Sequence, residues 1–277
     1  VIIPDPYWAA YNLIIKSVGG VPVPVHYVDD SKLLIEELER AITSKTKFIF
    51  VNSPSNPTGE ILIDEDLKKI ADLAEEKDII IISDEVYERM LFGEHKFSSI
   101  AKYAPKRTLR INSTSKTYAM TGWRIGWLTG DKDLIIQIAK CIRATIACVT
   151  NFIQYGAVAA LNGPQDFVKE CNEAFKRRRD IVVKVLNEAS GLKCVSPKGA
   201  FYVFVDCSEL FGKSTSAGNV IKDSNDLATY FLEEAHVAVV SGESFGVRGF
   251  FRISYAVSDE DLYESCNKLK DACRALI

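Results

Sequence analysis

The chain has 277 residues, of which 47% are hydrophobic and 26% charged, and this composition fits a globular protein with one large or two smaller domains. A formal net charge of −3 gives no basic surface for nucleic acid. The apolar runs are all shorter than the about 18 residues needed to span a bilayer. The one basic run, residues 176–179, lies in a helical pattern and is expected to be a solvated helix face. We therefore expect neither a nucleic-acid nor a membrane partner.

The first half of the chain alternates short apolar runs with amphipathic stretches. We predict strands over residues 1–3, 22–27, 47–52, 79–84, 108–112 and 125–129, with helices such as 32–42 and 64–77 between them. Asp64 is the expected N-cap of the helix over 64–77. The alternation indicates an α/β fold with a mostly parallel sheet flanked by helices. Ligands on such sheets bind beyond the carboxyl ends of the strands.

The pattern changes after the chain break at residues 162–164. We predict a long helix over 167–189, strands over 201–206, 237–240 and 250–254, and a helix over 225–235. A last helix begins near Ser258, because Ser258 and Asp261 have the spacing of a capping box. We expect a large domain, residues 1–163, and a smaller C-terminal α+β domain, residues 164–277, which begins with the long helix.

Cysteine and histidine usage bears on the compartment and on metal binding. Seven cysteines form no C-x-x-C pair, and two pairs (Cys141 with Cys148, Cys266 with Cys273) are seven residues apart in helical patterns. We expect each pair to share a buried face as reduced thiols, which favours the cytoplasm. The three histidines are scattered without ligand spacing, so no metal site is expected.

The segment 112–127 carries the most informative chemistry of the chain. It places Lys116 beside Ser113 and Ser115, and Arg124 follows eight residues later in a glycine-flanked turn. A lysine amine can form an imine with a carbonyl cofactor, while hydroxyls and an arginine can hold a phosphate. Pyridoxal 5′-phosphate (PLP) carries both groups. The alternative is a helix-start turn with a solvent-facing lysine.

Another enzyme class shares part of this motif. The spacing of Ser113 and Lys116 matches the S-x-x-K motif of the penicillin-binding proteins, but that class also needs a K-T-G motif. The chain has no convincing K-T-G, and we reject this alternative.

Three further motifs lie at or near predicted strands. Asn56 belongs to a proline-rich turn after residues 47–52, and Asp84 ends the apolar run 79–84, with Tyr87 three residues later. Arg252 interrupts an otherwise apolar strand, where an unpaired guanidinium would be costly and therefore indicates an anionic partner. Alternatives are a plain turn residue for Asn56 and a helix N-cap for Asp84.

Taken together and in this order, these segments resemble the class I/II aminotransferases of PLP fold type I, and most of all their prokaryotic aspartate-type subgroup. The resemblance implies a PLP-binding large domain that contains most of the site. In that site Lys116 would form the imine and move the proton, and Asp84 would pair with the pyridine nitrogen. Tyr87 and Asn56 would bind the ring 3′-oxygen, Trp8 would stack on the ring, and the phosphate would be held by Ser113, Ser115 and Arg124. Arg252 with Asn56 would bind the substrate α-carboxylate. For Trp8 the alternative is a core tryptophan at a helix start.

The implied reaction moves an amino group between an α-amino acid, aspartate first and then aromatic amino acids or alanine, and a 2-oxo acid such as 2-oxoglutarate. A PLP-dependent lyase or decarboxylase, and the PLP-binding sensor domain of a transcription regulator, stay open as alternatives. The resemblance also implies a homodimer. The sequence departs from many relatives at Ser241, where they carry proline.

The resemblance covers the whole chain but begins late in the family's sequence. We expect roughly a hundred residues to precede it in a full two-domain member. Those residues would include a phosphate-cupping turn, so residues 1–277 alone are expected to bind PLP weakly.

Overall fold

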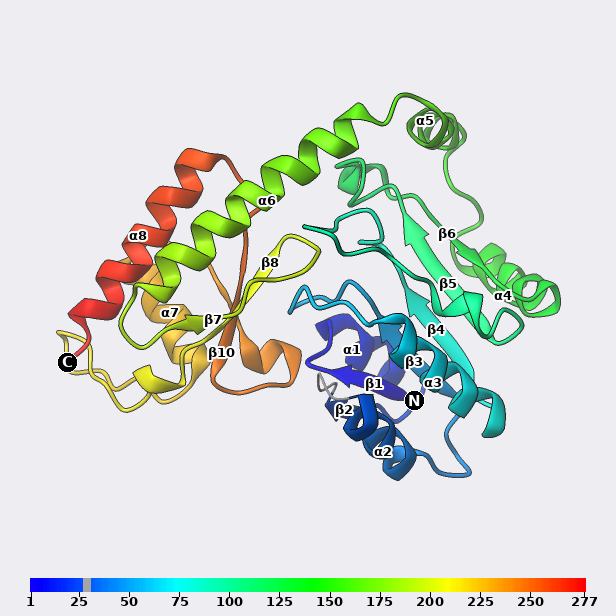
Figure 1. Cartoon of the computed structure of the whole chain (residues 1–277), viewed down its shortest axis with the longest axis horizontal. Coiled ribbons are helices and arrows are strands. Elements are labelled where there is room, and N and C mark those ends of the chain that lie inside the picture. Colours follow the sequence, from blue (N-terminus) through cyan, green and yellow to red (C-terminus); the bar gives the residue numbers. More distant parts are fainter. Residues whose placement is uncertain (27–30) are drawn as a thin grey trace. The chain divides into compact units, whose positions relative to one another are not determined.

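The computed structural model describes residues 1–26 and 31–277, so the last residue of the strand predicted over 22–27 lies outside the described part. The chain divides into two compact units. The first comprises residues 1–4, 15–54 and 61–171, and the second comprises residues 5–14, 55–60 and 172–277. Each unit is built around one sheet, which Figure 1 shows with its helices.

The first unit contains a six-stranded sheet in the order β2-β1-β3-β4-β5-β6. Its strands are β1 (Ile2–Asp5), β2 (Val23–His26), β3 (Phe48–Asn52), β4 (Ile80–Asp84), β5 (Thr108–Ser113) and β6 (Gly126–Thr129). The pairs β1–β3, β3–β4 and β4–β5 are parallel, whereas β5–β6 is antiparallel. The predicted mostly parallel α/β sheet is confirmed. All six predicted strands are present.

Helices α2 (Ser31–Ala41) and α3 (Asp64–Glu76) pack on one face of this sheet. Alternate residues of three strands, Ile2, Ile49 and Ile81 among them, point into the same core as Leu38 and Ile70 of the two helices. The period of two in the strands and the helical spacing in α3 produce this core. On the opposite face Phe50, Ile80 and Ile82 are only half-buried.

The second unit contains an antiparallel sheet in the order β7-β8-β10-β9. Its elements are α6 (Asp166–Asn187, which begins in the first unit), β7 (Lys193–Cys194), β8 (Tyr202–Asp206), α7 (Ser224–Glu234), β9 (Val240–Ser241), β10 (Phe250–Ser254) and α8 (Asp259–Ala275). Buried side chains of β8, β10, α7 and α8 form its core. The helix start predicted near Ser258 is confirmed, since Ser258 is the N-cap of α8 and its hydroxyl accepts from the Asp261 amide at 3.0 Å.

Two local predictions are wrong. Asp64 is the first residue of α3 rather than its N-cap, and Ile63 occupies the cap position without a side-chain bond. The Asp64 carboxylate instead accepts from Lys102 at 3.2 Å. The strand predicted over 237–240 is only β9, residues 240–241, because the Val237 amide donates to the Phe231 carbonyl of α7 and not to a neighbouring strand.

The cysteine prediction holds for one pair and fails for the other. Cys266 and Cys273 are buried on α8, and burial raises the pKa of each thiol to about 12. Cys141 and Cys148 are exposed. Helix α4 (Lys132–Thr145) has no buried residue, and it ends before Cys148, so the two thiols share no helix face.

Candidate active site

The carboxyl ends of β3, β4 and β5 meet at one edge of the first unit's sheet. Asn52 pairs with Asp84 in the parallel β3–β4 register, and Asp84 pairs with Ile111, two residues before Ser113. Asp84 and the Lys116 segment follow adjacent parallel strands, as predicted from the sequence, and they therefore lie at one edge of the sheet. This is where open α/β sheets bind ligands.

Asp84 is 9% exposed, and its position is fixed by a bond to its own carbonyl and by the contacts of the next residue. The Asn52 side-chain amide donates to the Asp84 carbonyl at 3.1 Å. The next residue, Glu85, points away into a buried ion pair, in which Arg110 Nε donates to Glu85 Oε2 at 2.7 Å. Ser83 and Ser99 donate to the other Glu85 oxygen. A buried carboxylate with all its partners in place fixes the end of β4 and hence the position of Asp84.

Lys116 lies in the turn after β5 and is half-buried. Its Nζ is 6.0 Å from the centre of the Tyr87 ring, and Tyr87 is 3% exposed. Two backbone bonds shape the turn, from the Tyr118 amide to the Thr114 carbonyl and from the Ala119 amide to the Lys116 carbonyl. The structure thus brings Lys116 and Tyr87 together, as their predicted roles require.

Ser113 and Arg124 are brought close in backbone register. Ser113 pairs with Gly126 across the antiparallel β5–β6 pair, and Arg124 precedes Gly126 by two residues. A Cβ at Gly126 would stand 2.8 Å from the Asn112 carbonyl oxygen, so glycine is needed for this approach. Arg124 has φ 53° and is exposed, with Nη1 donating to the Thr121 carbonyl. Ser113 Oγ accepts from the Ser115 amide at 3.2 Å, and the Ser115 side chain is half-buried.

The second unit holds the remaining predicted site residues. Arg252 Nη1 donates to Asn56 Oδ1 at 2.8 Å, which joins two residues 196 positions apart. The guanidinium carbon lies 4.2 Å from the Tyr202 ring centre and 4.9 Å from that of Phe245. Two aromatic faces and one amide orient the arginine in a half-buried setting. The composition of this strand gave no sign of the aromatic pair, because Phe245 lies in the turn before β10 and Tyr202 on a neighbouring strand.

Asn56 is positioned by a tight turn. Gly59 has φ +71°, and its carbonyl accepts from the amides of Lys198 and Gly199. A Cβ at Gly59 would stand 2.5 Å from Pro197 Cβ, so a larger residue would displace the turn. This close contact, together with the ion pair of Lys198 and Glu60, fixes Asn56 beside Arg252.

Trp8 immediately precedes α1 (Ala9–Ser17) and is 42% exposed. Its ring meets that of Tyr11 edge to face, with centroids 5.5 Å apart. The Tyr7 amide donates to the Phe245 carbonyl at 3.1 Å, which anchors this segment in the second unit. An exposed ring face suits stacking on a ligand and disfavours the alternative of a core tryptophan.

The chemistry of these side chains fits PLP. The sheet edge of the first unit offers one primary amine, one carboxylate, one phenol, and a hydroxyl with a guanidinium, matching the aldehyde, ring nitrogen, ring oxygen and phosphate of the cofactor. Among residues 1–26 and 31–277 no cluster of three or more metal-ligating side chains occurs.

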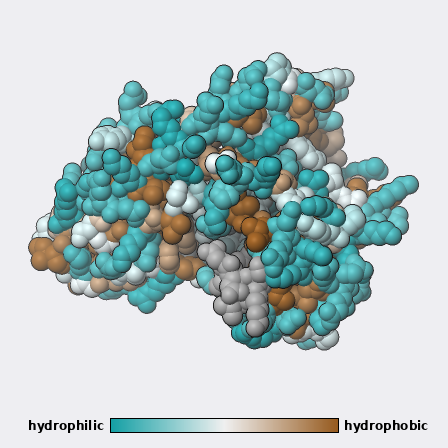
Figure 2. All heavy atoms as spheres, in the orientation of Figure 1, coloured by the Kyte–Doolittle hydropathy of each residue, from teal (hydrophilic) through white to brown (hydrophobic). Residues whose placement is uncertain are grey.

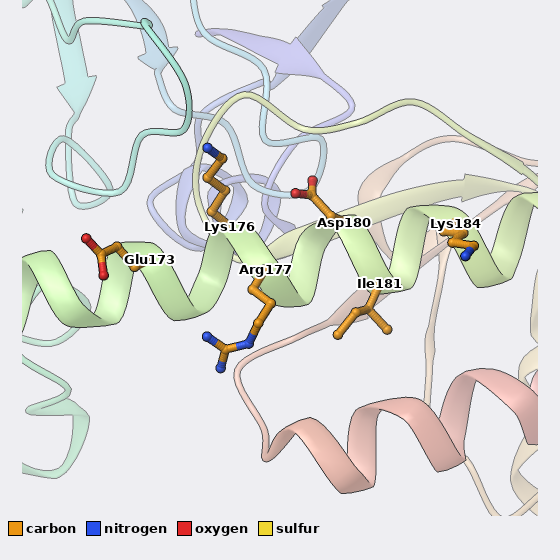
Figure 3. Close-up of a pocket in the computed structure, with 6 residues that line it drawn as sticks. All are labelled: Glu173, Lys176, Arg177, Asp180, Ile181 and Lys184. Carbon is orange, nitrogen blue, oxygen red and sulfur yellow. The ribbon is translucent and has the colours of Figure 1, made fainter.

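A surface hollow of about 460 Å³ lies elsewhere, along α6 (Figure 3). It is lined by Glu173, Lys176, Arg177, Asp180, Ile181 and Lys184. Its charged side chains diverge from the helix in Figure 3 instead of converging on one point. The solvated helix face predicted for residues 176–179 holds for Lys176 and Arg177, which are exposed, and fails for Arg178 and Arg179, whose side chains are 22% and 14% exposed. Arg177 and Arg178 both pair with Asp259. The hollow shares no residue with the candidate site.

Comparison with known proteins gives one consistent result. Residues 1–269 match the family model of aminotransferase class I and II. The chain is 43% identical to an aspartate aminotransferase of Rhizobium meliloti and 42% identical to a probable aspartate/prephenate aminotransferase of Rickettsia felis. Each match covers all of this chain and 69% of the relative. The crystal structure of an aspartate aminotransferase from Rhizobium meliloti matches with a TM-score of 0.93 at 41% identity, over all of this chain and 70% of that one.

Proposed function

The chain belongs to the aminotransferase class I and II family, and on that premise we propose that it moves the amino group of aspartate to a 2-oxo acid such as 2-oxoglutarate. It is an enzyme, and its cofactor is PLP, as in its family. The observation that supports the proposal most is the placement of Lys116, Asp84 and Tyr87 at one sheet edge. We also propose that residues 1–163 form the cofactor-binding domain and residues 164–277 the smaller domain.

The roles of the individual residues are part of this proposal. When bound, PLP supplies an aldehyde and a ring that takes up the electrons left as substrate Cα loses its proton. Lys116 holds the cofactor and carries the proton from substrate Cα as a general base. Asp84 keeps a proton on the ring nitrogen, because a buried carboxylate favours a neighbouring cation. Ser113, Ser115 and Arg124 hold the phosphate, Tyr87 and Asn56 the ring oxygen, and Trp8 covers the ring.

The choice of aspartate follows from the relatives, which are named aspartate and aspartate/prephenate aminotransferases. Profiling of amino donors against 2-oxoglutarate with the full-length protein tests it. We expect aspartate to exceed alanine and the aromatic amino acids. Prephenate belongs among the acceptors assayed, since that name accompanies several relatives. Preference for an aromatic donor would contradict the proposal.

Arg252→Leu is expected to lower kcat/KM about a hundredfold or more for amino acids and 2-oxo acids alike. A charge-assisted bond to a carboxylate contributes roughly 1.5–3 kcal/mol, and a forked pair contributes two such bonds. Steady-state kinetics with aspartate, alanine and 2-oxoglutarate measure the loss. The cofactor's visible spectrum should not change, because Arg252 binds the substrate.

Arg248→Leu is the matched control, since Arg248 is also an arginine of the second unit and donates to the Lys222 carbonyl at 2.7 Å. It should stay within about twofold of wild type. If Arg252→Leu impaired only dicarboxylic substrates, Arg252 would bind the side-chain carboxylate, and the proposed role would be wrong.

We propose further that the enzyme is a homodimer. Segment 123–167 of the first unit exposes large apolar side chains on α4, α5 (Asn151–Asn162) and their flanks: Trp123, Ile136, Ile142, Ile146, Phe152, Tyr155, Val158, Leu161 and Phe167. Figure 2 shows such brown residues over α5. Apolar surface of this extent is typical of protein interfaces, and a second copy would cover it.

The mass of the full-length protein in solution tests this proposal. Light scattering should give twice the chain mass, and Tyr155→Glu should shift the protein toward monomer because it buries a charge in the interface. Val195→Glu, at a 78% exposed position of the second unit, should leave the mass unchanged. A monomeric wild type would show that this apolar surface is covered in another way.

No helix among the described residues meets the length and hydropathy needed to cross a membrane. We propose a cytoplasmic location because all seven cysteines are free thiols.

A further inference from the structure

A polar cluster of the first unit lies next to the Lys116 turn and has no part in the roles proposed so far. Gln165, in the linker between α5 and α6, accepts at Oε1 from Arg89 Nη1 at 2.6 Å and from the Tyr118 hydroxyl at 2.9 Å. Arg89 Nη1 also lies 3.4 Å from the Tyr118 oxygen. These three residues, the Gln165 cluster, are 29 to 76 positions apart in sequence.

The orientation of the Gln165 amide is fixed by its other end. Nε2 donates to the Ala160 carbonyl at 3.0 Å and to the Gly163 carbonyl at 2.8 Å, both at the C-terminal end of α5. Both donor hydrogens are therefore used on backbone acceptors. The amide oxygen must face Arg89 and Tyr118, because exchange with the nitrogen would lose the bond from Arg89 and both bonds to backbone carbonyls.

Each partner of Gln165 is two residues from a proposed site residue. Tyr118 follows Lys116 by two positions, and Arg89 follows Tyr87 by two. The turn that joins Lys116 to Tyr118 is short and continues into Ala119 with φ 52°, a left-handed conformation that alanine rarely adopts. A backbone in this conformation needs support from its surroundings. The Tyr118 hydroxyl supplies such support from the α5–α6 linker.

We propose that Arg89, Tyr118 and Gln165 are positioning residues that set the place of the Lys116 amine. This inference rests on the proposed function in one respect only, the role of Lys116 in the reaction. The Gln165 cluster links the turns after β4 and β5 to the start of α6. These links hold the distance between Lys116 and Tyr87 constant. A shift of about 1 Å in a reacting group can cost up to a hundredfold in rate, so the anchoring affects kcat more than substrate affinity.

Three variants of the full-length protein test this. Tyr118→Phe removes only the hydroxyl, Gln165→Leu removes the shared acceptor, and Arg89→Leu removes the cation, with Arg89→Lys as the conservative variant. The controls lie outside the cluster. Tyr230→Phe removes a tyrosine bond to the Ala272 carbonyl, and Arg107→Leu removes an arginine paired with Glu75 and Asp78.

Two readouts are needed. The first is steady-state kinetics, in which each cluster variant should lose about tenfold in kcat with KM within about twofold of wild type. The Tyr118→Phe/Gln165→Leu double variant should be no slower than the slower single variant, because both changes break the same link. Arg89→Lys should recover part of the loss.

The second readout does not depend on the cofactor. Trace acetylation of cofactor-free protein, followed by peptide mapping, measures the reactivity of each lysine amine. Lys116 should be labelled several times faster in the cluster variants, since its turn is less restrained, while Lys102 keeps its wild-type rate. The melting temperatures should match those of the controls, which separates a positioning effect from general destabilisation.

Wild-type kcat together with unchanged Lys116 labelling in all cluster variants would overturn the inference. Equal loss in the controls would also overturn it, because the effect would then be one of stability. An error in the proposed function looks different: wild type would lack amino transfer, yet the labelling experiment would still report whether the Gln165 cluster restrains Lys116.

Discussion

Lys116→Ala is expected to reduce amino transfer by on the order of 10⁴-fold or more. Two functions are lost together. Alanine can neither hold the cofactor covalently nor carry the proton from substrate Cα, and general base catalysis alone contributes up to about 10⁴-fold. Because Lys116 is half-buried in a turn and lies outside the core, the fold should persist.

Single-turnover kinetics with aspartate measure this loss, and the melting temperature reports the fold. Lys102→Ala is the matched control, since Lys102 is a lysine of the same unit whose partner is the exposed Asp64. It should keep full activity. A Lys116→Ala protein with more than about a hundredth of the wild-type rate would remove Lys116 from the chemistry.

Asp84→Asn should leave the cofactor bound but slow the removal of the substrate Cα proton about ten- to a hundredfold. Loss of a charge-assisted partner costs on the order of 1.5–3 kcal/mol, and each 1.4 kcal/mol is tenfold in rate. The amide keeps the size of the carboxylate, and the bond from Asn52 goes to the Asp84 backbone, so the end of β4 should not move.

The matched control for this substitution is Asp78→Asn, because the Asp78 side chain is 90% exposed and pairs with Arg107 at the surface. Stopped-flow half-reactions with aspartate distinguish proton removal from product release. A half-reaction within about threefold of wild type would show that Asp84 has a structural role, as the alternative of a capping residue implies.

The sheet could be predicted because its strands are short apolar runs separated by helices with a clear apolar face. Asp84 and Lys116 could be placed beyond strand ends for the same reason, since parallel strands end at one edge. The prediction of buried cysteines failed because a sequence pattern does not show which helix faces are covered by other elements. Cys141 has helical spacing to its neighbours, but no residue of α4 is buried.

Side-chain contacts between residues far apart in the chain could not be predicted from the sequence either. Gln165 meets Arg89 and Tyr118 only after the chain folds, at separations of 76 and 47 positions. Similarly, the aromatic faces of Tyr202 and Phe245 reach Arg252 from other segments. A polar residue in a linker gives no periodic pattern, so only the folded chain reveals such contacts. The N-cap predicted at Asp64 was wrong by one position, because a sequence pattern defines the end of a helix only to within one or two residues.

The most direct test of the account is the site at which the cofactor attaches. The full-length protein loaded with PLP should be reduced with borohydride, which makes the attachment permanent, then digested and mapped by mass spectrometry. One labelled residue, Lys116, is expected. Label on any other lysine, or a reduced protein that carries no cofactor, would contradict it.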